Sequence, residues 1–469
     1  MGGMMELIIW SIFAILSATG LIIPTIDYLK GVRTGPYIAL ISTAASTILL
    51  TFLMRESGTI FNGLIRVDPL STYIAFIAAF GSFLVILASL SQAKDWSTAP
   101  SLYSLILLSL LGVLFILYAN DASVVIASWA LVAIASYVIV GMRKDEASLE
   151  ASVKYSLMGV ASSSLLIFGF ALVLGVTKES QLIQLSYVST QLRDILILGV
   201  LILIAAVGFK MGVFPFHAWL PDVYGGANPL LVSFVSGVVK LISIGAFIRV
   251  LQPLIPAISD YWFTAMAILS ILTMFYGNLA ALVQRNVQRM MAYSSIAQAG
   301  YFLIAFAALS SSTQLALQAI GLQVTTYVLA KIGIFVGLSY LSRKGFELTL
   351  DGLKGSGRIM RLSGSMIAIL ILSLMGMPPL IGFWSKFMYI FFSVMDIAPW
   401  LALLGVINSG ISVGYYALVL RYMYFANPPD LEAKESSRDP ELYVLAIVGV
   451  LSVVLGLGLV DYLVLLLSY

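Results

Sequence analysis

Residues 229–247 read PLLVSFVSGVVKLISIGAF, an almost unbroken apolar stretch with one lysine, Lys240, near its middle. Its length is close to the roughly 20 residues that an α-helix needs to cross the hydrocarbon core of a bilayer. The 469-residue chain as a whole has the same character, since 61% of its residues are hydrophobic, 10% are charged and the mean hydropathy is +1.04. Soluble domains carry about 25% charged residues. The sequence therefore predicts an all-α, polytopic membrane protein.

Apolar runs of this length predict about fourteen transmembrane helices. They start near residues 5, 35, 69, 99, 122, 152, 193, 228, 261, 290, 313, 364, 398 and 442. The connections are mostly short, so we expect no folded domain outside the lipid bilayer. The charge balance, 25 Lys and Arg against 22 Asp and Glu, excludes a role in binding nucleic acid.

Cysteine is absent from the chain, and histidine occurs once, as His217. Iron–sulfur clusters are held mainly by cysteine, haem by histidine or cysteine, and structural zinc by both. We therefore expect no metal or redox cofactor in this chain.

Lysine and arginine are concentrated on alternate connections, for example at Arg143, Arg289 and Arg343. The opposite connections carry fewer basic residues, among them Arg193 and Arg249. The positive-inside rule then predicts that the first set is cytoplasmic. Both termini are expected to lie outside, in a protein of the plasma membrane.

Five lysines fall inside the predicted spans: Lys154, Lys210, Lys240, Lys331 and Lys386. A charge at a helix centre costs about 2.5–3.5 kcal/mol, so such residues usually serve a function. The alternative is that each side chain snorkels to an interface, most readily Lys154 at the start of its span. The sequence does not require an acidic residue beside any of these lysines. Without such a partner, burial and the positive charges of neighbouring lysines both disfavour the charged ammonium form. This pattern predicts a relay of amines that hold and release protons.

Proline interrupts two predicted spans, the seventh at Pro215 and the twelfth at Pro378-Pro379. Broken helices at membrane depth are tolerated where they line polar cavities. We therefore expect these two breaks to face a polar cavity that exposes Lys210 and Lys386. Matching breaks in two halves of a transporter indicate inverted repeats, although simple packing kinks are the alternative. The predicted organisation is three helices over 1–98, a first repeat over 99–251, an inverted repeat over 252–425, and a final loop and helix over 426–469.

Three ordered blocks resemble a known family. The first is Phe209-Lys210 followed by PFHAWLPDVYGGANP over 215–229; the second contains GNL at 277–279 and AYSSI at 292–296; the third is GMPP at 376–379 with Lys386. Together they resemble the antiporter-like membrane subunits of respiratory complex I (NADH-quinone oxidoreductase), which are related to Mrp-type antiporter subunits. Pro-Asp-Val-Tyr at 221–224 is most similar to subunit N.

The resemblance implies a proton (or cation) channel of two half-channels joined by a central hydrophilic axis. The positions that match the family's proton-relay residues are Lys154, Lys210, His217, Lys240, Lys331 and Lys386. Lys210 resembles the central lysine of the first half, and Lys386 the residue that opens to the outer side. The resemblance also implies that quinone and iron–sulfur clusters reside in partner subunits, and that the partners include homologous antiporter-like subunits.

One position departs from the family pattern. The family places a glutamate in the fifth span, paired with the lysine of the sixth, and the alignment puts Ala130 at that position. We therefore expect Lys154 to pair with Glu150, one helical turn before it, or to reach cytoplasmic water. Asp222 and Tyr224 are expected to anchor the seventh span at the cytoplasmic face.

The predicted function is proton translocation in the membrane arm of a complex I-like quinone oxidoreductase, an enzyme complex in which this subunit carries no redox centre. A sodium/proton antiporter subunit, of the Mrp type or linked to a hydrogenase, is the alternative. A third possibility is a structural subunit that has lost transport, which the retained lysines oppose and Ala130 favours. The sequence does not identify the electron donor, which is NADH or another reductant.

Overall fold

The structure is a computed structural model that describes residues 2–30, 34–93, 96–185, 192–428 and 433–467. Within these residues, 11 helices are long and apolar enough to cross a membrane, and three shorter apolar helices accompany them. The stretch Pro229–Leu282 is divided by a 3₁₀ segment into two crossings, and two of the short helices form one broken crossing. The described residues thus account for about fourteen crossings, as the apolar runs predict.

The helices of the first half are bounded as follows: α1 (Gly2–Lys30), α2 (Gly35–Thr51), α3 (Pro69–Ser89), α4 (Ala99–Tyr118), α5 (Ala122–Val140), α6 (Glu146–Thr177), η2 (Leu182–Gln184), α7 (Arg193–Met211), α8 (Trp219–Gly226), α9 (Pro229–Phe234), η4 (Val235–Val239), α10 (Leu241–Ala246), η5 (Phe247–Leu251) and η6 (Gln252–Ile258). Those of the second half are α11 (Ser259–Leu282), α12 (Val287–Ala308), α13 (Thr313–Arg343), α14 (Ser356–Ile359), α15 (Arg361–Met375), α16 (Ile381–Phe383), η7 (Trp384–Ile390), η8 (Phe392–Val394), α17 (Pro399–Phe425), α18 (Pro440–Val454), η9 (Leu455–Leu459) and α19 (Val460–Leu466).

A short antiparallel hairpin is the exception to the all-α prediction. Strands β1 (Gly58–Ile60) and β2 (Ile65–Val67) pair through Thr59 and Arg66. The turn between them has three successive residues in the left-handed region, ending with Gly63 at φ +86°. Glycine adopts this conformation without a steric penalty, which explains its place in so tight a turn.

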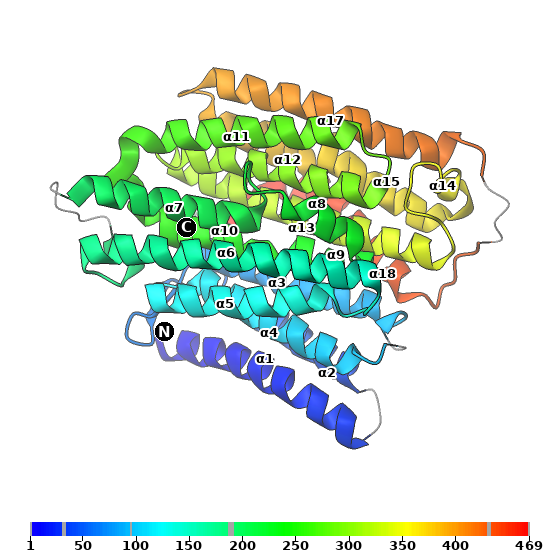
Figure 1. Cartoon of the computed structure of the whole chain (residues 1–469), viewed down its shortest axis with the longest axis horizontal. Helices are drawn as coiled ribbons and strands as arrows, with labels where there is room; N and C mark the ends of the chain where they lie inside the picture. The colour runs from blue at the N-terminus through cyan, green and yellow to red at the C-terminus, as the bar shows by residue number, and fades with distance from the viewer. Residues whose placement is uncertain (1, 31–33, 94–95, 186–191, 429–432, 468–469) are drawn as a thin grey trace.

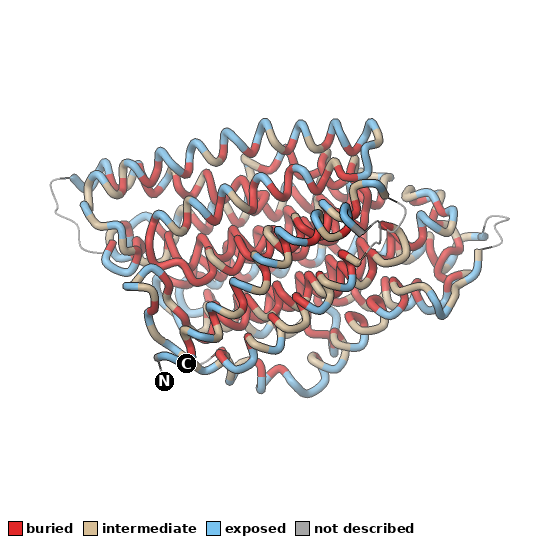
Figure 2. The backbone as a smooth tube through the Cα atoms, turned by 90° about the horizontal axis from the view of Figure 1, so that it is seen from below, coloured by how far each residue is buried: buried red, intermediate tan, exposed pale blue. Residues whose placement is uncertain are grey.

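The long helices lie side by side along one direction, with α1 at one edge of the bundle and α17 at the opposite edge (Figure 1). The centre is formed by α12, α13 and the helices that follow Pro229, whose apolar windows are 94–100% buried. Figure 2 shows the same distribution, with buried backbone in the middle and exposed backbone on the outer helices. Helices that are apolar on every side belong at such a centre.

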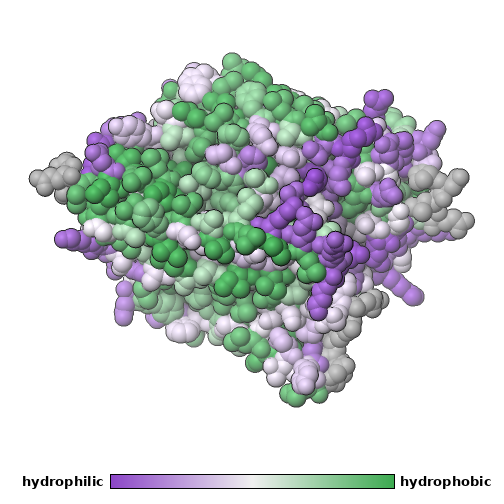
Figure 3. Space-filling model, in the orientation of Figure 1, coloured by the Kyte–Doolittle hydropathy of each residue, from purple (hydrophilic) through white to green (hydrophobic). Residues whose placement is uncertain are grey.

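The two ends of the bundle differ in charge. We call the end that carries Arg143, Arg289 and Arg343 the basic end, because these residues line adjoining cavities there. The hydrophilic residues gathered at the right of Figure 3 belong to it. The opposite end carries the β hairpin and both ends of the chain, and we call it the hairpin end (Figures 1 and 2).

The two proline-containing spans are broken, as predicted. Helix α7 ends at Met211, Gly212 follows with φ +83°, and α8 begins only at Trp219. Helix α15 ends at Met375, Gly376 follows with φ +89°, and α16 begins at Ile381. A left-handed glycine is a common way to end a helix. Both breaks contain a cis bond before proline, Phe214-Pro215 and Pro378-Pro379. The repeat boundaries at 99–251 and 252–425 stay a prediction.

Candidate functional site

Two buried lysines are joined through α12. The Lys240 Nζ donates to the carbonyl oxygen of Ser295 at 2.9 Å, and the Lys331 Nζ donates to Met291 O and Ser294 Oγ, both at 2.9 Å. Lys240 is 4% exposed and Lys331 is fully buried. Lys240 directly follows the π-helical turn η4, a distortion that is frequent at functional sites.

Lys386 lies in the π-helical segment η7 and donates to the carbonyl oxygen of Leu374 at 2.5 Å. Leu374 stands just before the break, where the helix no longer supplies a backbone donor for every carbonyl. The side chain of Gln298 donates to the same oxygen at 3.4 Å. The expectation that the breaks expose Lys386 and Lys210 in a cavity is wrong, because the two side chains are 0% and 3% exposed. The freed carbonyl oxygen of Leu374 is thus satisfied by a buried amine.

Lys210 lies in the last turn of α7, next to the first break. Its Nζ donates to Ser136 Oγ of α5 at 3.3 Å. The amine also lies between two aromatic rings, 4.8 Å from the centroid of Tyr137 and 4.7 Å from that of Tyr155.

Each of the four buried lysines lies against a tyrosine ring. Tyr327 is 5.0 Å from the Lys240 Nζ and 5.9 Å from the Lys331 Nζ, and Tyr301 is 4.3 Å from the Lys386 Nζ. A cation over a desolvated ring gains about 2 kcal/mol. The rings therefore supply part of the stabilisation that a carboxylate would give. Sequence reasoning missed these tyrosines, although phenol groups inside otherwise apolar spans were a signal.

Lys154 is placed differently from the other four lysines. Its Nζ pairs with Glu150 at 2.7 Å and with Asp222 at 3.2 Å, and its side chain is 44% exposed. The predicted pairing with Glu150 is confirmed. Asp222 also pairs with Arg289 at 2.5 Å, so it anchors α8 at the basic end, as expected. Ala130 lies on an exposed face of α5, so a carboxylate there would stand at the surface of the chain.

His217 lies within the first break and is 6% exposed. Its ring packs 4.1 Å from the ring of Tyr276 and 5.4 Å from that of Phe214. Among the described residues, its Nδ1 has no hydrogen-bond partner. Among the described residues, the contacts of His217 therefore run to aromatic rings, including that of Tyr276 on α11.

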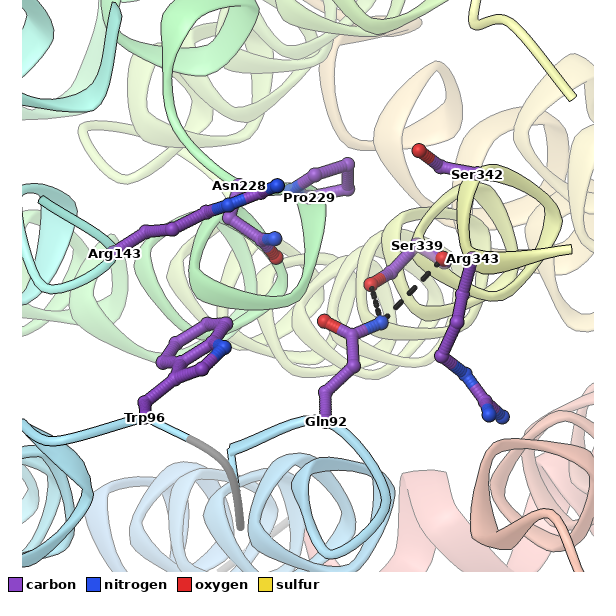
Figure 4. A pocket seen from close by; sticks show the side chains of 8 residues that line it. All are labelled: Gln92, Trp96, Arg143, Asn228, Pro229, Ser339, Ser342 and Arg343. Atoms are coloured by element: carbon purple, nitrogen blue, oxygen red, sulfur yellow. Dashed lines mark hydrogen bonds between the residues drawn. The ribbon is translucent and has the colours of Figure 1, made fainter. Parts of the chain in front are cut away.

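A polar cavity of about 210 Å³ opens at the basic end (Figure 4). Its lining comes from several elements, namely Gln92, Trp96, Arg143, Asn228, Pro229, Ser339, Ser342 and Arg343. The side-chain amide of Gln92 donates to Ser339 Oγ at 2.7 Å. Ser339 follows Lys331 by about two turns of α13. The cavity therefore lies toward the basic end of α13, about two helical turns from Lys331.

A second polar cavity, of about 380 Å³, opens at the hairpin end, and we call it the hairpin-end cavity. Arg249 lines it, although sequence reasoning placed this residue on a connection. That placement is wrong, because Arg249 lies in η5 and is 5% exposed. Its guanidinium pairs with Asp68 at 2.5 Å and donates to the carbonyl oxygens of Leu117 and Arg66. These bonds supply the partners that a buried arginine needs.

The described residues contain no cluster of three or more His, Cys, Asp or Glu side chains that could hold a metal ion. What the site offers is a set of amines, hydroxyls and amides buried in a membrane-spanning bundle. Such groups exchange protons and exclude bulk water.

Comparison with known proteins shows to which family of membrane proteins this chain is similar. Residues 119–412 match the family described as NADH:quinone oxidoreductase/Mrp antiporter, TM. F(420)H(2) dehydrogenase subunit N of Methanosarcina mazei is 30% identical, over 95% of this chain and 94% of that protein. NADH-quinone oxidoreductase subunit N of Desulforamulus reducens is 32% identical, over 93% of this chain and 91% of that protein. A chain of respiratory complex I from Thermus thermophilus is 27% identical and superposes with a TM-score of 0.81, over 95% of this chain and 97% of that one.

The chain belongs to the NADH:quinone oxidoreductase/Mrp antiporter family of membrane proteins. The predicted resemblance to antiporter-like subunits, and to subunit N among them, is confirmed.

Proposed function

We propose that this chain translocates protons through its buried lysines, as one membrane subunit of a complex that reduces a quinone in neighbouring subunits. The observation that carries the proposal is the arrangement of Lys240 and Lys331. Both amines are buried, no carboxylate among the described residues pairs with either, and both bond to consecutive turns of the same helix, α12. Burying amines in this way costs free energy, so such residues usually serve a function.

The path runs from the basic-end cavity to Lys331 and Lys240, with Lys386 and Lys210 as the buried amines of the two broken helices. A proton arriving from the cavity of Figure 4 is held by one amine and passed on through hydroxyl groups and bound water. Tyr327 lies against both central amines, so it stabilises whichever of them carries the charge. His217 and Lys154 stand at the margins of this path, His217 against aromatic rings and Lys154 at the basic end.

By the positive-inside rule, the concentration of basic residues favours a cytoplasmic basic end, with the hairpin end and both termini outside the plasma membrane. The partners are other antiporter-like membrane subunits and the subunits that hold quinone and iron–sulfur clusters. The exposed apolar side chains of α1, α6 and α17 supply the surfaces for lipid and for these neighbours, for example Leu7, Leu157 and Leu403.

A sodium/proton antiporter subunit is the second candidate, because the family description includes the Mrp antiporters. The two functions differ in what accompanies the chain and in which ion moves. We expect the native complex, purified through this chain, to contain quinone-site and iron–sulfur subunits. Vesicles containing it should then acidify on quinone reduction without added sodium. A complex without these subunits, or acidification that requires sodium, would establish the antiporter function instead.

A further inference from the structure

The hairpin-end cavity has no place in the proton path proposed above, and one of its arginines has no partner. Arg66 and Arg249 both line the cavity, together with Asp68. Arg249 and Asp68 form an ion pair at 2.5 Å, so their charges neutralise each other. Among the described residues, the side chain of Arg66 has neither a hydrogen bond nor an ion pair. Two arginines and one aspartate therefore leave the cavity wall with one uncompensated positive charge.

The β hairpin fixes the direction in which Arg66 projects. Successive residues of a strand point to opposite faces. Ile65 lines an apolar cavity with Phe61, whereas Arg66 lines the hairpin-end cavity. The carbonyl oxygen of Arg66 accepts from the Arg249 guanidinium at 2.8 Å, so the backbone at Arg66 is tied to the cavity wall. The hairpin thus presents the guanidinium of Arg66 to the cavity and leaves its N–H donors free.

Two glutamine side chains add further donors to the cavity. The side-chain amide of Gln252 makes no hydrogen bond among the described residues. Gln314 donates to Leu467 O at 3.3 Å, which uses one of the two N–H groups of its amide. Free N–H donors favour an acceptor group, and the net positive charge favours an anion. The planar fork of an arginine matches the oxygen atoms of a phosphate or a carboxylate.

The lining of the cavity changes from polar to apolar along the direction of the helices. Arg66 precedes the first residue of α3, and Gln314 is the second residue of α13, so both lie at the ends of membrane-crossing helices. Leu70 and Leu317 line the same cavity from positions further inside these two helices. A phospholipid carries its groups in the same order, with the phosphate at the membrane surface and the acyl chains below it. A free anion would gain nothing from the apolar part of the wall.

The cavity also reaches the lipid-facing surface of the bundle. Ile183 of η2 belongs to its wall and is 47% exposed. Helix α7 contacts η6, another part of the wall, and its side chains Ile195, Leu198 and Leu201 are exposed. A volume of about 380 Å³ is within the range of roughly 300–1,000 Å³ that small-molecule sites occupy. It accommodates a headgroup, and the acyl chains then extend onto the exposed apolar surface.

We infer that the hairpin-end cavity binds the phosphate group of a phospholipid, with Arg66 as the charged ligand and Gln252 as a second donor. This site is separate from the proposed proton path and does not depend on it. The phosphate neutralises the surplus positive charge of the wall. Asp68 does not repel the phosphate, because Arg249 holds its carboxylate at 2.5 Å.

Chemical modification of Arg66 measures whether the cavity is occupied. The native complex is purified, washed with detergent to remove lipid, and treated with the arginine reagent phenylglyoxal. Mass spectrometry gives the rate at which each arginine is modified. Arg193 is the internal control, because it lies at the start of α7, pairs with Asp260 at 2.7 Å, and does not line the cavity.

Three probes separate the phosphate group from the rest of the lipid. They are phosphatidylglycerol, a diacylglycerol with the same acyl chains but no phosphate, and inorganic phosphate. Phosphatidylglycerol at about ten times its Kd is expected to slow the modification of Arg66 about tenfold and to leave Arg193 unchanged. The other two probes, at the same concentration, are expected to have no effect on either arginine.

Each other outcome of this experiment overturns the inference. Equal protection of Arg66 and Arg193 by phosphatidylglycerol indicates general adsorption of lipid. Protection of Arg66 by inorganic phosphate indicates a site for the free anion, and protection by diacylglycerol indicates an apolar site that does not use the phosphate. An unprotected Arg66 shows that the cavity binds none of them.

Variants provide a second measurement in the assembled complex. Arg66→Gln removes the charge, and Gln252→Trp fills the cavity without changing the charge. Arg193→Gln is the matched control at the same end of the bundle. After the same detergent wash, both cavity variants are expected to retain about one phospholipid less per complex than the parent, and Arg193→Gln the parental number. Parental numbers in both cavity variants would overturn the inference and leave the proposed function standing; if one variant does not assemble, the other decides.

Discussion

Replacing Lys331 with methionine tests the buried axis directly, because the substitution removes the amine and keeps most of the side-chain volume. The partners of the amine retain other bonds. Met291 O still accepts from Ser295 Oγ at 3.0 Å, and Ser294 still bonds to Tyr416 at 2.5 Å. Neither Met291 O nor Ser294 Oγ loses its last partner, and a buried amine is removed. The free energy of unfolding should therefore change by about 1 kcal/mol or less.

Proton transfer should respond far more strongly than stability to the loss of Lys331. Without the amine, an excess proton crosses this part of the bundle with no basic group to hold it, at a cost of about 3 kcal/mol. A barrier raised by that amount slows the transfer roughly 100-fold. Pumping through this subunit should then fall to about 1% of the parental rate, by the relation between barrier and rate.

The assay is the acidification of inverted membrane vesicles during quinone reduction, expressed as protons per electron. The amount of assembled complex is measured in the same vesicles, and the thermal unfolding midpoint of the purified complex reports stability. A variant that assembles fully and keeps the parental ratio of protons to electrons would refute the role of Lys331.

Three further predictions concern other parts of the chain. Lys154→Ala should reduce pumping less than Lys210→Ala, because Lys154 is 44% exposed while Lys210 is buried; equal and near-complete losses would contradict this. At the basic end, burial raises the pKa of Asp439, but hydrogen bonds from neighbouring basic side chains and a tyrosine outweigh it and hold the pKa at about 2. Because this pKa is below that of the unfolded chain, the stabilisation is present above about pH 4 and is lost as the pH falls toward 2. Asp439→Asn should flatten the fall of the unfolding midpoint between pH 5 and 2.5, and an unchanged slope would count against it. A side chain on Gly277 would place its Cβ 2.5 Å from a backbone nitrogen of α12. Gly277→Val should thus cost about 1–3 kcal/mol of stability, whereas Gly410→Val, where a Cβ meets no atom within 4 Å, should cost less.

The number of crossings, the broken spans and the identity of the buried amines could be predicted from the sequence. Apolar length decides whether a segment crosses a bilayer, and it is read from consecutive residues. Pro215 and Pro378 break helices for a local reason, the loss of a backbone donor and a steric clash. The pairing of Lys154 with Glu150 was predictable for the same kind of reason, since residues four apart on a helix are neighbours.

Tertiary structure alone decided what each amine touches. The tyrosines that face the lysines come from other helices or other turns, and nothing in the local sequence tells which face of α12 accepts from Lys240 and Lys331. The same holds for Arg249, which the sequence pattern assigned to a connection and the structure buries against Asp68, far away in the chain. Its burial depends on carbonyl groups at the ends of α4 and β2 that meet only when the bundle forms. The sequence thus determined which residues enter the membrane, because that depends on transfer free energies summed along the chain. Packing determined how those residues are connected, because a hydrogen bond between helices depends on their positions in space.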